Sequence, residues 1–144
     1  MTLRVKLLTP AAKAPTVAHP GEDLGYDIYA AETRTIEPRG HALVPTGIAI
    51  ECTSAAGEKM GALLRDKSSM AARRLALTGG VIDAGYRGEI RVLLENLGDR
   101  PAVIHAGDKI ANLIPYPALT GAVHVVDDLS ESSRKAGGFG SSGR

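Results

Sequence analysis

Short stretches in which apolar and polar residues alternate recur along this chain, and the alternation predicts β-strands. Residues 3–7 (LRVKL) and 89–95 (EIRVLLE) show it most clearly. A period of two residues is typical of a strand with one face against the core and the other in water. We therefore expect the chain to consist mainly of half-buried strands.

The turn residues between these stretches divide the chain into its expected elements. Strands are predicted at residues 3–7, 25–31, 41–51, 60–64, 102–104, 109–116 and 122–126. Pro45 indicates an edge or a bulge in the long strand 41–51. One helical turn is expected, at residues 70–74, with Ser68 and Ser69 as its N-terminal caps.

Residues 79–95 are predicted to form a tight hairpin. The apolar pair Val81 and Ile82 leads into the turn, and the alternating stretch 89–95 leads out of it. Asp83 is then expected at a strand end, in a turn that also carries Tyr86.

The regular spacing of short strands predicts an all-β fold, either a double-sheet jelly roll or a Greek-key barrel. A chain of 144 residues fits a single domain. We assign residues 1–130 to this domain. Residues 131–144 are rich in glycine and serine, which predicts a flexible tail.

Charge and cysteine content narrow the function classes. Seventeen basic against sixteen acidic residues give a net charge of +1, so no overall field favours nucleic acid or membrane as a partner. Cys52 is the only cysteine, which excludes an intrachain disulfide and fits a reducing cytosol. Apolar runs are too short for a signal peptide or a membrane span. The expected location is the cytoplasm.

The tail carries the only phenylalanine, Phe139, within residues 137–143 (GGFGSSG). Arg134 and Lys135 precede it, so positive charge is followed by an aromatic ring. That order suits a ligand with a phosphate chain at one end and a base at the other. A disordered chain end is the alternative.

Two groups of residues could carry chemistry. Asp83 is a candidate base, because a carboxylate at a strand end can be partly desolvated and still reach a bound water; an ordinary turn aspartate is the alternative. Tyr86 could present its ring to a sugar or be an edge-strand tyrosine.

The second group comprises Arg65, Lys67, Ser68 and Ser69, which could bind an anion or form a solvated turn. The four histidines share no ligand spacing.

Five stretches, in this order, resemble the five motifs of the trimeric dUTP pyrophosphatases, the dUTPase family. They are residues 24–30 (LGYDIYA), 65–71 (RDKSSMA), 80–88 (GVIDAGYRG), 107–114 (GDKIANLI), and Arg134 with 137–143 (GGFGSSG). The resemblance implies a jelly-roll or β-clip barrel that assembles as a homotrimer. Each active site would draw on three chains, and the tail of one would close over the nucleotide.

The implied reaction is Mg²⁺-dependent hydrolysis of dUTP to dUMP and pyrophosphate by water attacking the α-phosphorus. Such an enzyme limits uracil incorporation into DNA and supplies dUMP for thymidylate synthesis. By the same resemblance, Asp83 would orient and deprotonate the water, and Tyr86 would pack on the deoxyribose and exclude a 2′-hydroxyl. Backbone groups of Thr78, Gly79, Gly80 and Val81 would pair with uracil.

The remaining roles concern the phosphates, the metal and the lid. The resemblance assigns the phosphates to Arg65, Lys67, Ser68, Ser69, Asn112 and Arg134, the stacking on uracil to Phe139 followed by Gly140, and Mg²⁺ to Asp27 through water. The triphosphate itself would supply the direct metal ligands.

The sequence departs from the family pattern in three places. The second motif usually reads Pro-Arg-Ser-Gly, and Lys67 keeps the charge of that arginine without its bidentate geometry. Asn112 stands where the fourth motif usually has Gln, which shortens the reach to phosphate. Residues 135–136 (KA) replace the commoner Gly-Ser.

Two other functions use the same fold. The related dCTP deaminases need a glutamate in the strand after the third motif; alignment on Asn96 puts Leu93 at that position, with Glu95 out of register. A non-catalytic nucleotide-binding protein would have no need of a water-activating base such as Asp83.

Overall fold

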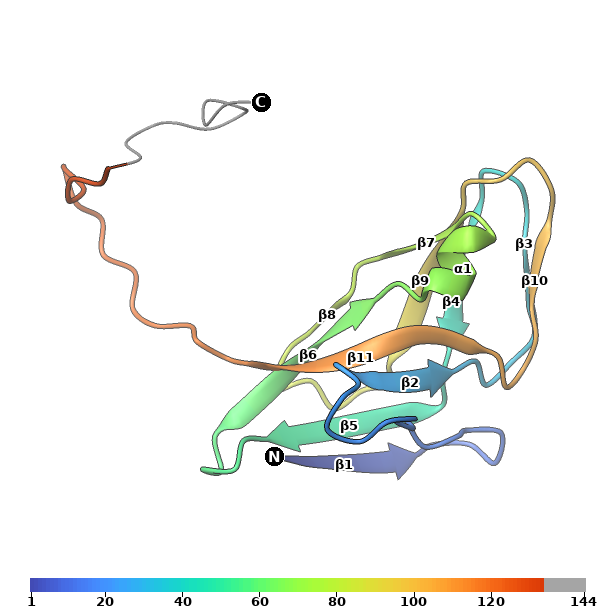
Figure 1. Cartoon of the computed structure of the whole chain (residues 1–144), viewed down its shortest axis with the longest axis horizontal. Coiled ribbons are helices and arrows are strands. Elements are labelled where there is room, and N and C mark those ends of the chain that lie inside the picture. The colour runs from blue at the N-terminus through green and yellow to red at the C-terminus, as the bar shows by residue number, and fades with distance from the viewer. Residues whose placement is uncertain (134–144) are drawn as a thin grey trace.

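The structure is a computed structural model that describes residues 1–133 (Figure 1). Its elements, in chain order, are β1 (Thr2–Leu7), β2 (Tyr26–Tyr29), β3 (Arg34–Ile36), β4 (His41–Pro45), β5 (Ile48–Thr53), β6 (Lys59–Arg65), α1 (Ser68–Ala72), β7 (Leu75–Thr78), β8 (Val81–Ile82), β9 (Arg91–Asn96), β10 (Ala102–Ile104) and β11 (Lys109–Pro117). The all-β prediction is confirmed, with one short helix in the described part of the chain.

The strands form two main antiparallel sheets. The larger has the order β1-β5-β6-β11-β2, with β8 paired to β6 beside this path. The second sheet has the order β4-β9-β7, and β10 pairs with β3 in a small separate ribbon. Figure 1 shows the β4-β9-β7 sheet above one end of the larger sheet, with the β3-β10 ribbon beyond it.

Aliphatic side chains from both sheets meet in one continuous core. Strand β9 keeps the predicted alternation, since Val92 and Leu94 are fully buried while Arg91 is exposed. Leu113 of β11 and Ile28 of β2 enter the same core from the larger sheet. Because the period-two pattern decides which face of a strand is buried, these strands were predictable from the sequence.

The predicted single strand 41–51 is wrong, because the chain turns a corner at Thr46 and Gly47. Gly47 has φ +67°, a conformation that a residue with a Cβ rarely adopts. Its amide donates to Glu89 Oε1 at 2.9 Å, and the buried Thr46 hydroxyl donates to the Ile90 carbonyl at 2.5 Å. The corner sends β4 into one sheet and β5 into the other.

The predicted hairpin is also wrong. Strand β8 pairs with β6, whereas β9 pairs with β4 and with β7, which the sequence pattern had not predicted. Two glycines allow β8 to approach β6. A Cβ on Gly61 would lie 2.5 Å from the Ile82 carbonyl oxygen, and one on Gly80 would lie 2.4 Å from that of Leu64. Residues 83–90, which we call the Asp83 loop, therefore cross between the two sheets.

The helix lies earlier than predicted. It spans Ser68–Ala72, so Ser68 and Ser69 are inside its first turn, and Lys67 occupies the N-cap without a side-chain cap hydrogen bond. The prediction that the serines cap the helix is therefore wrong. Met70 is buried and fixes the helix to the core.

Residues 118–133 leave the body of the molecule after β11 (Figure 1). They form no strand, so the predicted strand at 122–126 is wrong, and Val125 is 98% exposed. The division into a domain of residues 1–130 and a tail stays a prediction, because residues 134–144 lie outside the described part. Within residues 1–133, no helix has the length and apolarity needed to span a membrane.

We expect Gly61→Ala to lower the free energy of unfolding by about 1–3 kcal/mol, because the new methyl group would push against the backbone of β8. Urea denaturation followed by circular dichroism measures the change. Gly85→Ala is the matched control: nothing lies within 4 Å of its Cβ position, so a change within about 0.5 kcal/mol is expected. Equal stability of both variants would contradict the close packing of β8 on β6.

Candidate functional site

The Asp83 loop borders a hollow of about 260 Å³. Its lining consists of Leu43, Val81, Ile82, Asp83, Tyr86, Glu89 and Arg91. A turn closed by the Tyr86 amide and the Asp83 carbonyl, 3.0 Å apart, brings both predicted residues to this hollow. Asp83 is exposed, and no described residue forms a hydrogen bond or ion pair with its carboxylate. The carboxylate is free to accept a hydrogen bond from water.

The Tyr86 ring is held in a defined position. Its hydroxyl donates to the Glu89 carbonyl at 3.0 Å, and a Cβ on Gly88 would lie 2.4 Å from the hydroxyl oxygen. Gly88 therefore leaves the space that the ring fills. The Arg87 guanidinium closes the loop by donating to the Ala84 and Tyr86 carbonyls. Tyr86 remains 46% exposed, so part of the ring can contact a ligand.

A second hollow, of about 250 Å³, lies where β7, β8 and the end of β6 meet. Its lining consists of Leu63, Leu64, Arg65, Asp66, Leu77, Gly79, Gly80 and Val81. The exposed side chain of Val81 borders both hollows. Gly79 has φ +63°, and Asp66 fixes the adjacent strand by accepting from the Leu77 amide at 2.8 Å.

The Thr78 hydroxyl is the one buried side-chain polar group without a hydrogen-bond partner among the described residues. The nearby Gly80 carbonyl already accepts from the Leu64 amide at 2.7 Å. This carbonyl belongs to the backbone groups predicted to pair with uracil. One of its two acceptor positions is therefore already taken by a hydrogen bond within the chain.

Three residues predicted from separate motifs lie in one row across the larger sheet. Asn112 of β11 is the register partner of Asp27 on β2 and of Arg65 on β6. Directly opposed residues in antiparallel strands project from the same face. Their neighbours Ile28 and Leu64 are buried on the other face, so the row lies on the face away from the core.

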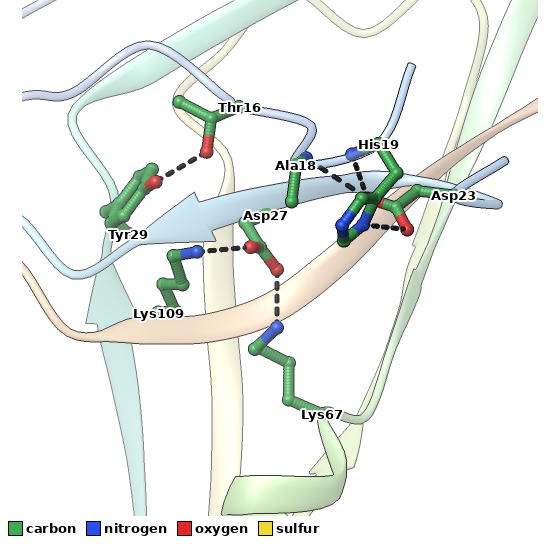
Figure 2. Close-up of polar contacts among 8 residues, drawn as sticks. All are labelled: Thr16, Ala18, His19, Asp23, Asp27, Tyr29, Lys67 and Lys109. Carbon is green, nitrogen blue, oxygen red and sulfur yellow. Dashed lines mark hydrogen bonds and ion pairs between the residues drawn. The ribbon is translucent and has the colours of Figure 1, made fainter. Parts of the chain in front are cut away.

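Two lysines converge on Asp27 (Figure 2). Lys67 donates to Asp27 Oδ1 from the residue before α1, and the Lys109 ammonium lies 2.7 Å from Asp27 Oδ2. The Asp27 side chain is only 14% exposed. We refer to Asp27, Lys67 and Lys109 as the lysine–aspartate cluster.

Sequence reasoning did not single out Lys109. The pairing of β11 with β2 shifts register between Lys109 and Ala111, and both Ile110 and Ala111 are fully buried. This β-bulge turns Lys109 to the face that carries Asp27 and Asn112. Simple alternation from Asn112 would place Lys109 on the opposite face. The only signal in the sequence was its position inside the fourth motif.

The cluster shifts the pKa of two of its members. Partial burial tends to raise the pKa of the Asp27 carboxyl, but the hydrogen bonds from Lys109 and Lys67 outweigh it and hold the pKa below its usual range. The hydrogen bond to Asp27 is the main reason that the pKa of Lys109 is raised. Asp27 is therefore ionised throughout the neutral range.

A metal ion bound through Asp27 does not fit this arrangement. Both carboxylate oxygens are already paired with ammonium groups, and these two positive charges repel a further cation. No group of three or more His, Cys, Asp or Glu side chains in residues 1–133 is placed to hold a metal. The assignment of Mg²⁺ to Asp27 stays a prediction from resemblance.

The predicted site is divided between the two ends of β6. Asp83 lies beside Gly61, whereas Arg65 ends the strand four residues later. Four residues of strand span about 13 Å. The structure therefore brings Asp83 and Tyr86 together at one end of β6. The other end gathers the predicted phosphate and metal residues Arg65, Lys67, Asn112 and Asp27. Ser68 and Ser69 are exposed beside Lys67. Arg134, Phe139 and Gly140 lie outside the described residues.

Comparison with known proteins identifies the family. A sequence model described as dUTPase matches residues 11–143. The chain is also 41% identical over 146 residues to a deoxyuridine 5'-triphosphate nucleotidohydrolase of Clostridium tetani, covering 99% of this chain and 97% of the relative. The chain belongs to the dUTPase family. The resemblance expected from the five motifs is confirmed.

Solved dUTPase structures share the fold. A mutant dUTPase of Staphylococcus bacteriophage 80alpha with dUpNHpp matches with a TM-score of 0.89 and 30% identity, covering 99% of each chain. A mutant dUTPase from phage phi11 of S. aureus, described with a structural Mg(II) ion, matches with a TM-score of 0.81 and 28% identity. That match covers 91% of this chain and 100% of the phage chain. The jelly-roll prediction is confirmed.

We expect Asp27→Asn to lower the free energy of unfolding by about 1–3 kcal/mol at pH 7, because two ammonium groups lose a charged acceptor. A carboxyl whose pKa is lowered on folding stabilises the protein above its unfolded pKa of about 4, and that contribution is lost as the pH falls through the folded value. The difference between the two proteins should therefore be constant from pH 5 to 7 and shrink below pH 4.

Urea denaturation at several pH values measures this difference. Asp99→Asn is the matched control, since Asp99 is exposed in the bend at residues 98–100 and its replacement should change stability by less than about 0.5 kcal/mol at any pH. A difference that grows on acidification would contradict a lowered pKa for Asp27.

Proposed function

We propose that this chain hydrolyses dUTP to dUMP and pyrophosphate, the reaction of a dUTP diphosphatase. The named relatives support the substrate. The observation that carries the proposal is the Asp83 carboxylate, which has no partner among residues 1–133, beside the fixed Tyr86 ring. In the cell this activity would limit uracil incorporation into DNA and supply dUMP for thymidylate synthesis.

Asp83 would orient the attacking water and take its proton. The new bond forms between the water oxygen and the α-phosphorus, and pyrophosphate leaves with the electrons of the broken bond. A carboxylate is a weak base, but phosphoryl transfer depends mainly on positioning and charge neutralisation. Tyr86 would pack on the deoxyribose and exclude a 2′-hydroxyl, because Gly88 and the Glu89 carbonyl hold its ring in place.

Uracil and the phosphates would bind at the remaining predicted positions. The backbone from Thr78 to Val81 would recognise the uracil edge. The Thr78 hydroxyl, which is buried and has no partner within the described part of the chain, supports a polar contact there. Positive charge for the phosphates would come from Lys67 and Arg65, with hydrogen bonds from Ser68, Ser69 and Asn112. Arg134, Phe139 and Gly140 would close over the nucleotide, as the fifth motif implies.

Mg²⁺ is the proposed cofactor. The structural Mg(II) ion described for the phage phi11 enzyme supports its presence in the family. Because the described residues offer no ligand set of their own, the ion would be bound by the triphosphate. It would neutralise phosphate charge there. A contact between Asp27 and the water shell of the ion would compete with Lys67 and Lys109.

We infer a homotrimer in which each active site uses more than one chain. The separation of Asp83 from Arg65 along β6, about 13 Å, supports this, since neighbouring chains would then supply the two parts of each site. The exposed apolar residues Val123, Val125 and Leu129 in the segment after β11 also support it, because apolar surface of this kind marks a contact with another chain. The proposed location is the cytoplasm.

The substrate assignment predicts a specific nucleotide profile. We expect release of pyrophosphate from dUTP in the presence of Mg²⁺, and little turnover of dCTP, dTTP or UTP. The Tyr86 ring would exclude the 2′-hydroxyl of UTP, and the backbone from Thr78 to Val81 would favour uracil over the other bases. A coupled pyrophosphate assay with and without metal measures this. Ammonia release from dCTP would indicate a deaminase, and binding of dUTP without turnover would indicate a non-catalytic protein.

We expect Asp83→Asn to reduce kcat for dUTP by about 10²–10⁴-fold, the usual contribution of a general base. Binding of dUpNHpp, measured by calorimetry, should change little, because Asp83 is proposed to contact water and not the nucleotide. Asp99→Asn serves as the control and should keep full activity. Near-normal turnover by Asp83→Asn would exclude Asp83 as the base.

A further inference from the structure

Lys109 belongs to the lysine–aspartate cluster, although no role has been assigned to it. Its ammonium lies 2.7 Å from Asp27 Oδ2 while Lys67 occupies Oδ1. Figure 2 shows Lys67, just before helix α1, and Lys109, on strand β11, reaching Asp27 with the carboxylate between them. The β-bulge in β11 is what directs Lys109 there.

The cluster carries one positive charge in excess. Lys67 with Asp27 alone would be a neutral pair and would attract an anion weakly. The second ammonium changes this balance, because two lysines face a single carboxylate. Arg65 and Asn112 lie in the same row of the sheet and add further positive charge and hydrogen-bonding capacity. The lysine–aspartate cluster, together with Arg65, therefore favours a ligand with several negative charges.

Each ammonium keeps donors for such a ligand. An ammonium group has three N–H donors, and Asp27 accepts one from each lysine. The Lys109 side chain is half-exposed, so its other donors can reach a molecule outside the sheet. Asp27 holds the two like charges close together, since without it they would repel one another and separate.

This arrangement also accounts for the lysine at position 67, where the second motif of the family usually has an arginine. A single arginine presents a rigid bidentate fork to a phosphate, whereas a lysine is a flexible point charge. Two lysines held on one carboxylate supply two donors in a defined relation, as the fork of one arginine does.

We infer that Lys109 is a further binding residue for the phosphate chain of the substrate, and that Asp27 positions the Lys67 and Lys109 ammonium groups for it. The inference deepens the proposed function and rests on it for the identity of the substrate. The ligand chemistry itself, a chain of phosphates, follows from the charge and geometry of the cluster.

Binding of inorganic tripolyphosphate to the full chain tests the cluster without the nucleoside. We expect Lys109→Met to weaken tripolyphosphate binding in calorimetry about tenfold, the effect of losing one charge-assisted hydrogen bond. Lys109→Arg should restore most of the affinity. Lys59→Met is the matched control, since it removes the same charge at the opposite end of β6 from Arg65 and should leave binding unchanged.

Kinetics provide the second readout. With dUTP, Lys109→Met should raise KM about tenfold and leave kcat within about twofold, because the residue binds substrate without taking part in proton transfer. Denaturation curves establish that each variant is folded. Equal tripolyphosphate affinity of Lys109→Met and Lys59→Met would overturn the inference, as would a loss in kcat at unchanged KM.

The two proposals fail in different ways. If the chain does not hydrolyse dUTP but Lys109→Met still weakens tripolyphosphate binding, the proposed function is wrong and the phosphate-binding cluster stands. If dUTP is hydrolysed normally and Lys109→Met matches the wild type in both KM and tripolyphosphate affinity, only the role of Lys109 is wrong.

Discussion

The buried corner at Thr46 and Gly47 is the constraint on which the rest of the structure depends. The Thr46 hydroxyl and the Gly47 amide, which belong to two buried residues, find their partners in the Ile90 carbonyl and the Glu89 carboxylate. Leaving such groups unpaired would cost about 1–3 kcal/mol each. The same bonds separate β4 from β5 and fix the end of the Asp83 loop, so the division into two sheets and the position of Asp83 have one cause.

The close backbone contact between β8 and β6 also fixes the geometry of the site. Gly61 and Gly80 let β8 lie against β6 at a distance that a single methyl group would prevent. The exposed Val81 side chain then stands between the two hollows, one beside Asp83 and one beside Arg65. Strand β6 thus carries both parts of the site while keeping them at opposite ends.

Charge organises the other end of β6. Asp27, Asn112 and Arg65 come from three adjacent strands and share one face, and the lysines bring the positive charge that Asp27 partly neutralises. Partial burial would favour a neutral carboxyl at Asp27, yet the two ion pairs outweigh it. The site therefore has one charged, polar end, formed by Asp27, Asn112 and Arg65 with the two lysines. Its other end is the Asp83 loop, which carries a carboxylate and the Tyr86 ring.

The sequence by itself determined the β-rich class, the strand at 102–104, most of β1, β6 and β11, and the membership of Asp83, Tyr86 and Asn112 in the motifs of one family. It could do so because alternation and turn residues are local properties that are visible in a few neighbouring positions. Only the tertiary structure decided which strands pair. The splitting of residues 41–51 depends on what surrounds Gly47, and the pairing of β8 with β6 depends on which backbone faces Gly61. Lys109 reaches Asp27 because a bulge reverses its side, and a bulge exists only in relation to a partner strand.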